Sequence, residues 1–161
     1  MKWVKQSIHY WCPDTKEHKF LGQNVTVAIL DTGISPHPDF KGRILSFRDF
    51  SSTTGSSEKV LFSFSHFSPL IDNSGHGTHV AGILAGSGLL SSGTYAGIAP
   101  FCNLIIGKVL DQNGNGSIKN VINGIQWIRD IYTQFHIRII NISVGTRPDL
   151  SIHQKLLLLH A

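Results

Sequence analysis

The sequence has little charge and few cysteines. Asp, Glu, Lys and Arg together make up 15% of its 161 residues, whereas about 25% is usual in soluble domains. This shortage excludes the charge-rich composition of an intrinsically disordered segment. Only two cysteines are present, Cys12 and Cys102, and they do not form a Cys-x-x-Cys motif. The sequence therefore excludes a disulfide framework, and it agrees with a reducing compartment.

Long apolar runs and long basic runs are also missing. No apolar run approaches the roughly 18 residues of a membrane span, which excludes an integral membrane protein. The net charge is +4, but the basic residues are scattered, so a nucleic-acid-binding patch is not supported. The N-terminal residues reach no apolar stretch of signal-peptide length before Pro13. We therefore expect a cytoplasmic protein without nucleic-acid or membrane partners, with secretion as the alternative if the N-terminus is incomplete.

The sequence does contain enough apolar residues to form one core. Hydrophobic residues make up 41% of the chain, and its length suits a single domain of about 150 residues. We expect residues 1–22 to be a polar and aromatic lead-in, and residues 23–161 to form the domain. Short β-branched or aliphatic runs that end at polar residues or Gly predict the strands, at residues 25–30, 44–50, 104–110 and 138–144.

Two segments between these strands have helical character. Residues 76–86 are rich in Gly and Ala, and Gly is a poor helix former, so we expect a helix that its neighbours approach closely. After Ser117, apolar residues recur with a helical period, which predicts an amphipathic helix. Its expected buried face comprises Ile118, Val121, Ile122, Ile125, Ile128 and Tyr132. The alternation of strands and helices predicts the α/β class, with a parallel β-sheet and helices on both faces.

Two further segments lie outside this alternation. The Ser/Thr-rich residues 51–70 predict a surface loop. Residues 150–161 have the composition of a helix that stops without a capping residue. A parallel sheet that ended after residues 138–144 would have an unpaired edge and an uncovered apolar face. We therefore expect a domain that is truncated at its C-terminus.

Asp31 and His76 are the residues whose positions indicate chemistry. Asp31 follows a predicted strand, at the edge where open α/β sheets place their ligand crevices. His76 begins a predicted helix, after the N-cap candidates Asp72–Ser74. A carboxylate that accepts the imidazole Nδ1–H fixes the tautomer and leaves Nε2 as a base. Taken singly, each residue has an ordinary structural interpretation, Asp31 as a turn former and His76 as a surface or core histidine.

The residues around Asp31 and His76 resemble the subtilisin-like serine peptidases. The segment Asn73–Gly82, which contains Ser-Gly-His-Gly-Thr-His, is the most specific part of this resemblance. The other matching segments, which follow in the order known from the family, are Val27–Ile34, His37–Phe40, Gly97–Pro100, Lys108–Leu110, Ile122–Ile125 and Asn141–Gly145. A Ser-rich insertion without a secretion signal is most similar to the bacterial intracellular and AprX-like members.

The resemblance implies roles for individual residues. Asp31 would orient His76, and His76 would be the general base. The substrate cleft, where the family pairs the peptide as an added strand, would be lined by Ser143, Val144 and Gly145. Asp39 matches a position that binds structural calcium in many relatives, with a helix-capping or turn-forming role as the alternative. The chemistry requires no cofactor, and the implied partner is a polypeptide substrate.

The nucleophile of the family is not found in the sequence. In subtilisin this serine lies in a Gly-Thr-Ser segment about 160 residues after the histidine, so it would fall about 70 residues beyond Ala161. Neither Ser143 nor Ser151 lies in such a segment. The resemblance therefore implies part of a serine-type endopeptidase that is inactive alone and needs a C-terminal segment with the serine. The alternative is a non-catalytic peptide-binding or complementation module.

Overall fold

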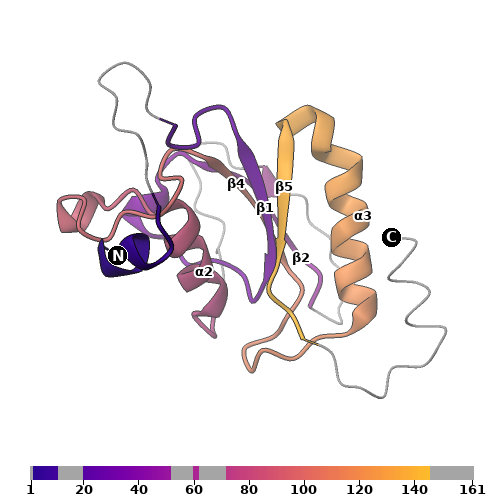
Figure 1. The fold of residues 1–161 in the computed structure, drawn as a ribbon. Helices are drawn as coiled ribbons and strands as arrows, with labels where there is room; N and C mark the ends of the chain where they lie inside the picture. The colour runs from indigo at the N-terminus through magenta and orange to yellow at the C-terminus, as the bar shows by residue number, and fades with distance from the viewer. Residues whose placement is uncertain (1, 11–19, 52–59, 62–71, 146–161) are drawn as a thin grey trace.

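The fold is built on one mostly parallel sheet, shown in Figure 1. The computed structural model describes residues 2–10, 20–51, 60–61 and 72–145. The strand order is β3-β2-β4-β1-β5. The strands are β1 (Thr26–Asp31), β2 (Ile44–Asp49), β3 (Val60–Leu61), β4 (Asn103–Lys108) and β5 (Ile137–Ile142). All neighbouring strands pair in parallel except β3, which is antiparallel to β2. The expected parallel sheet is confirmed, and β1 lies inside it between β4 and β5.

Two helices cover opposite faces of the sheet, as the sequence predicted. Helix α2 (His76–Ala85) lies on one face and the longer helix α3 (Ile118–Phe135) lies on the other (Figure 1). Three short elements complete the described structure: helix α1 (Lys2–Ser7) and the 3-10 turns η1 (Pro38–Phe40) and η2 (Leu89–Ser91). Within the described residues, no helix has both the length and the apolar character that a membrane span requires.

Strand β1 contributes to both halves of the core because its side chains alternate between the two faces. Val27 and Ile29 pack in the cluster on the α2 side. Ala28 and Leu30 pack in the cluster on the α3 side. All four side chains are at most 2% exposed, and burying each large aliphatic side chain contributes about 1.5–3 kcal/mol. This burial fixes the carboxyl end of β1, where Asp31 lies.

The buried face of α3 agrees with the predicted one in part, and Ile118, Ile122 and Ile125 are half-buried. Val121 and Ile128 are buried as expected, but Tyr132 is 55% exposed, whereas Trp127 and Ile131 are buried. Gly124 also belongs to the buried face, and a Cβ added there would lie 3.0 Å from Leu30 Cδ2. A face counted from hydrophobic side chains alone omits this glycine, and the prediction that Tyr132 is buried was wrong.

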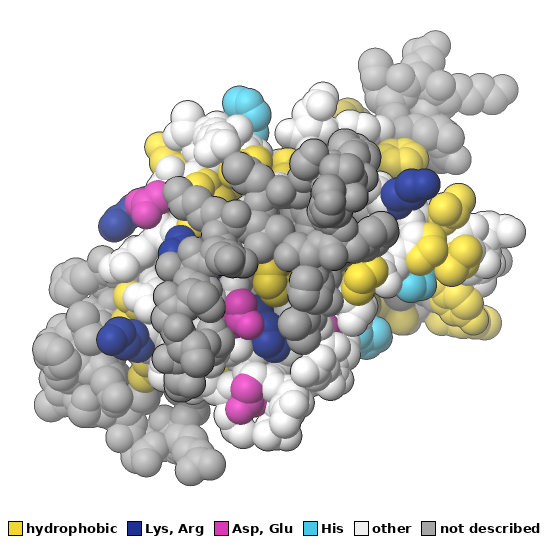
Figure 2. All heavy atoms as spheres, turned by 180° about the vertical axis from the view of Figure 1, so that it is seen from behind, with side chains coloured by type: hydrophobic (Ala, Val, Ile, Leu, Met, Phe, Trp, Pro, Cys, Tyr) yellow, Lys and Arg dark blue, Asp and Glu magenta, His cyan; other side chains and the backbone are white. Residues whose placement is uncertain are grey.

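The lead-in is not without structure, because it contains α1. The Lys5 ammonium group donates a hydrogen bond to the Gly97 carbonyl oxygen at 2.8 Å, and the Tyr10 hydroxyl donates one to Ile98 at 2.7 Å. Large apolar side chains are exposed here: Trp3 of α1 is 82% exposed, and Leu90 of η2 is 68% exposed. Figure 2 is seen from behind, and apolar side chains gather at its right, which is the side at the left of Figure 1 where α1 lies.

Two other segments differ from the sequence-based expectations or fall outside the described residues. Within the predicted loop at 51–70, residues 60–61 form strand β3, whereas residues 52–59 and 62–71 lie outside the described residues. The expected C-terminal helix at 150–161 also lies outside them. Strand β5 is the last strand on its side of the sheet among the described residues. Its isoleucines 139, 140 and 142 are each more than 40% exposed.

Candidate active site

Asp31 and His76 come from two elements that meet at the carboxyl edge of the sheet. Asp31 is the last residue of β1 and has no exposed surface. His76 is the first residue of α2. The helix begins there because Gly75 takes a left-handed conformation, with φ of 84°. An Asp at the end of an internal strand and a His at a helix start are thereby brought to the same edge.

The two side chains are in hydrogen-bonding contact. His76 Nδ1 lies 2.7 Å from Asp31 Oδ1. The same carboxylate oxygen accepts the backbone N–H of Thr32 at 2.7 Å, which fixes the orientation of the carboxyl group. The other oxygen, Asp31 Oδ2, is buried and has no hydrogen-bond partner among the described residues. The distance that the sequence-based hypothesis required between Asp31 and His76 is therefore present.

The contact with Asp31 also changes the acid–base behaviour of His76. The hydrogen bond to Asp31 and then the charge of Asp31 raise the pKa of His76 above its ordinary value. The His76 side chain is 53% exposed, so its ring is open to a ligand. With Nδ1 bound to Asp31, Nε2 is the nitrogen left to take a proton, and it has no hydrogen-bond partner among the described residues.

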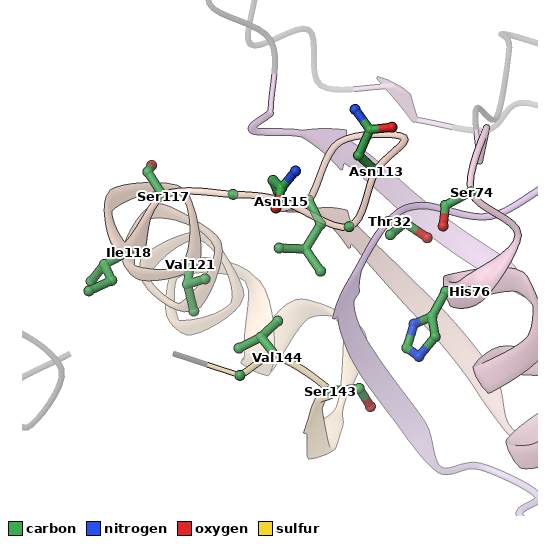
Figure 3. A pocket seen from close by; sticks show the side chains of 14 residues that line it. Thr32, Ser74, His76, Asn113, Asn115, Ser117, Ile118, Val121, Ser143 and Val144 are labelled. Atoms are coloured by element: carbon green, nitrogen blue, oxygen red, sulfur yellow. The ribbon is translucent and has the colours of Figure 1, made fainter. Parts of the chain in front are cut away.

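An open cleft of about 640 Å³ borders His76. The predicted cleft residues Ser143, Val144 and Gly145 all line this cleft. Figure 3 shows His76 on one side and the first turn of α3 on the other, with Val144 between them. Ser143 and Gly145 are exposed and Val144 is half-buried. Residues 143–145 follow β5 directly, so the end of this strand leads into a cleft that His76 also lines.

Sequence reasoning missed part of the support for this site. It did not consider Thr32, whose hydroxyl accepts the N–H of Gly77 at 2.9 Å. It treated Asp72 as one of three N-cap candidates, whereas the structural N-cap is Gly75, without a side-chain hydrogen bond. Asp72 nevertheless accepts the N–H groups of Gly75 and Thr78. A carboxylate four residues before the first residue of a helix whose N-cap is glycine is the signal that could have identified it.

Asp39 lies in η1, away from this cleft. Its Oδ2 accepts the backbone N–H of Gly88 at 2.9 Å. Its Oδ1 is buried, lies 3.9 Å from His37 Nδ1 and has no hydrogen-bond partner among the described residues. The guanidinium group of Arg43 donates hydrogen bonds to the carbonyl oxygens of Asp39 and Ala85. Within the described residues, no three His, Cys, Asp or Glu side chains gather to hold a metal. The hydrogen bond that Asp39 accepts from Gly88 agrees with the turn-forming alternative, and the calcium-binding role stays a prediction.

Comparison with known proteins places this geometry in a family. A family model described as the subtilase family, Peptidase S8, matches residues 22–156. Serine protease AprX of Bacillus subtilis is 47% identical over 106 residues, which are 66% of this chain and 21% of that protein. The major intracellular serine protease of Bacillus subtilis is 37% identical over 131 residues, which are 80% of this chain and 36% of that protein.

Solved structures agree with these relatives. Sphericase is 29% identical, with a TM-score of 0.66 over 85% of this chain and 42% of that chain. The CspB protease of Clostridium perfringens has a TM-score of 0.74 over 92% of this chain and 35% of that chain, and its 24% identity shows the fold alone. The chain spans about a fifth to a third of the length of the two curated relatives above. The resemblance inferred from the motifs is confirmed, and the chain belongs to the subtilase family of serine proteases.

Proposed function

We propose that this chain supplies the acid–base pair and one wall of the substrate cleft of a serine endopeptidase. The observation that carries the proposal is the 2.7 Å contact between His76 Nδ1 and Asp31 Oδ1, beside an open cleft. In this role Asp31 holds the imidazole in one tautomer and stabilises the imidazolium that forms when Nε2 takes a proton. The raised pKa of His76, caused first by the hydrogen bond to Asp31, supports this assignment.

The nucleophile in this proposal is a serine that the chain does not contain. Subtilisin carries its nucleophile about 160 residues after the histidine, which is beyond the 161 residues of this sequence. The exposed hydroxyl of Ser143 accepts a hydrogen bond from the Asn141 amide at 2.9 Å, not from His76. Without an activated hydroxyl no acyl-enzyme can form. The chain alone is therefore expected to bind peptides without hydrolysing them.

The cleft suits a polypeptide substrate in an extended conformation. Residues 143–145 continue from an edge strand, and an extended peptide adds to such an edge through backbone hydrogen bonds. The exposure of Ser143 and Gly145 leaves their backbone groups accessible for this pairing. In the same proposal the peptidase domain comprises residues 23–161, and the protein acts in the cytoplasm. Asp39 anchors the loop at Gly88, with structural calcium at Asp39 as the alternative that the family resemblance implies.

Labelling with a serine-directed fluorophosphonate tests the proposal. The chain alone should remain unlabelled and should not cleave a peptide substrate. The chain is then mixed with a separately produced polypeptide, the part of serine protease AprX that follows its match to this chain. The added polypeptide should become labelled in the mixture. The variant His76→Ala should abolish this labelling, and His79→Ala, an exposed histidine in the same helix, should not.

Two outcomes would contradict the proposal in different ways. Labelling of the chain alone would show that it carries its own nucleophile. A mixture that binds peptide but is never labelled would favour the non-catalytic peptide-binding module instead. Peptide binding is measured by fluorescence anisotropy of a labelled peptide, so that the second outcome is distinguished from a chain that has not folded.

A further inference from the structure

Asp72 has more hydrogen bonds than an ordinary helix cap requires. Its Oδ1 accepts the Thr32 hydroxyl at 2.8 Å and the N–H groups of Ser74 and Gly75 at 3.2 and 2.9 Å. Its Oδ2 accepts the N–H and the hydroxyl of Thr78 at 2.8 and 2.5 Å. An ordinary cap satisfies free N–H groups at the start of its own helix. Asp72 does this for α2 and also bonds to Thr32, which directly follows β1.

Thr32 hydrogen-bonds to Asp72, to the carboxylate of Asp31 and to the residue after His76. Its hydroxyl donates to Asp72 and accepts the N–H of Gly77, the residue after His76. Its backbone N–H donates to the carboxylate of Asp31. The peptide groups on both sides of His76 are therefore held, Gly75 by Asp72 and Gly77 by Thr32. This arrangement restrains the backbone of His76 relative to the Asp31 carboxylate.

The carboxylate of Asp72 is in the charge state that this network needs. Partial burial alone would raise the pKa of Asp72, but hydrogen bonds from Thr78, Gly75 and Thr32 outweigh it and lower the pKa. Ser35 extends the network, since its N–H donates to the Thr78 hydroxyl at 2.9 Å. Hydrogen bonds to an ionised acceptor are about twice as strong as neutral ones. The start of α2 is thus joined to the segment after β1 by a charged centre.

We propose that Asp72, acting through the Thr32 hydroxyl, is a positioning residue that holds the His76 imidazole against Asp31. The inference rests on the proposed function, because it takes Asp31 and His76 as the acid–base pair. Asp72 itself does not touch the reacting atoms in this proposal. It fixes the separation between the end of β1 and the start of α2, on which the contact between His76 and Asp31 depends.

NMR of the intact chain tests the proposal without any nucleophile. The two readouts are the downfield signal of the proton shared between His76 Nδ1 and Asp31, and the pKa of His76. Thr32→Val removes the hydroxyl at nearly constant volume and constant charge. It should broaden or abolish the Nδ1 proton signal and lower the pKa of His76. Thr32→Ser restores the hydroxyl and should recover both, a rescue that a purely steric role of Thr32 would not give.

A matched pair of carboxylate variants completes the design. Asp72→Asn should have the same effect as Thr32→Val. Asp111→Asn should leave both readouts unchanged, although Asp111 also accepts two backbone N–H groups in its loop, those of Asn113 and Asn115. Circular dichroism shows which variants are folded, and if Asp72→Asn does not fold, the comparison of Thr32→Val with Thr32→Ser decides.

The outcomes separate this inference from the proposed function. An unchanged Nδ1 signal and His76 pKa in folded Thr32→Val would overturn the positioning role of Asp72 and leave the acid–base pair intact. The absence of a downfield Nδ1 signal from the wild-type chain would contradict the contact between His76 and Asp31. It would therefore overturn the proposed function together with the positioning role.

Discussion

The buried ammonium group of Lys108 donates a hydrogen bond to the backbone carbonyl of Thr32. Lys108 is the last residue of β4 and lies opposite Asp31 in the parallel register of β4 and β1. Its ammonium group also donates to the carbonyl of Leu110 at 3.0 Å. One lysine thus links the turn after Asp31 to the loop on the far side of the cleft.

Removal of this ammonium group should destabilise the fold. Lys108→Met keeps the length and the apolar part of the side chain. It leaves the carbonyl groups of Thr32 and Leu110 without their charged donor. We expect a loss of about 1.5–3 kcal/mol in the free energy of unfolding, as for other hydrogen bonds to charged groups. Urea denaturation measures this loss. Lys119→Met on the exposed surface of α3 is the control and should change stability by less than about 0.5 kcal/mol.

The two glycines of α2 should respond in opposite directions to alanine. In Gly77→Ala the new Cβ would lie 2.3 Å from the Gly33 carbonyl oxygen, so the helix would have to move. We expect the free energy of unfolding to fall by about 1–3 kcal/mol and the His76 Nδ1 proton signal to weaken. In Gly82→Ala nothing lies within 4 Å of the new Cβ, so a gain of up to about 1 kcal/mol is expected from helix propensity. Thermal unfolding and NMR of both variants provide the comparison.

The contact between Asp31 and His76 should make the free energy of unfolding depend on pH. Because Asp31 raises the pKa of His76, the ion pair contributes its full stabilisation below the ordinary His pKa of about 6.5. This contribution is lost as the pH rises through the folded-state pKa. Asp31→Asn should lower the pKa of His76 and remove this part of the pH dependence. NMR titration measures the first effect, with His79 as an internal reference, and an unchanged His76 curve would contradict the pairing.

Substitutions in α3 should distinguish its structural face from the predicted one. Trp127 is 5% exposed and its ring packs against Phe50, with ring centroids 5.7 Å apart. Trp127→Ala should therefore cost about 3–5 kcal/mol of unfolding free energy. Tyr132 lies on the same helix and is exposed, so Tyr132→Ala should cost less than about 0.5 kcal/mol. Equal losses in the two variants, measured in urea, would contradict the observed face.

The strands and the positions of Asp31 and His76 could be predicted because their signals are local. A buried run such as residues 25–30 needs no knowledge of its neighbours, and a residue that follows it must lie at the carboxyl edge. The buried face of α3 could be predicted only in part, because Gly124 also faces the core, with Leu30 in close approach, and a face counted from hydrophobic side chains omits it. Periodicity placed Val121 and Ile128 on the buried side, and the packing around Gly124 decided how far that side extends.

The supporting network was missed for a different reason. The hydrogen bond between Thr32 and Asp72 joins residues 40 positions apart, and neither residue forms a recognisable pattern with the other in sequence. Helix α1 was missed because its contacts are also distant, with Lys5 and Gly97 separated by 92 positions. Strand β3 was missed because two residues are too few to show an alternation of polar and apolar side chains.

The position of β1 inside the sheet has a consequence for the order of folding. Its two neighbours are β4 and β5, which lie more than 70 and more than 100 residues later in the chain. Loop-closure entropy makes such distant parallel pairings slow to form. Asp31 and His76 are only 45 positions apart, and both have been synthesised long before β5. Strand β1, which carries Asp31, nevertheless gains its neighbours on both sides only when β4 and β5 pair with it. The strand that ends in the acid–base pair is therefore among the first to be synthesised and among the last to be fully paired.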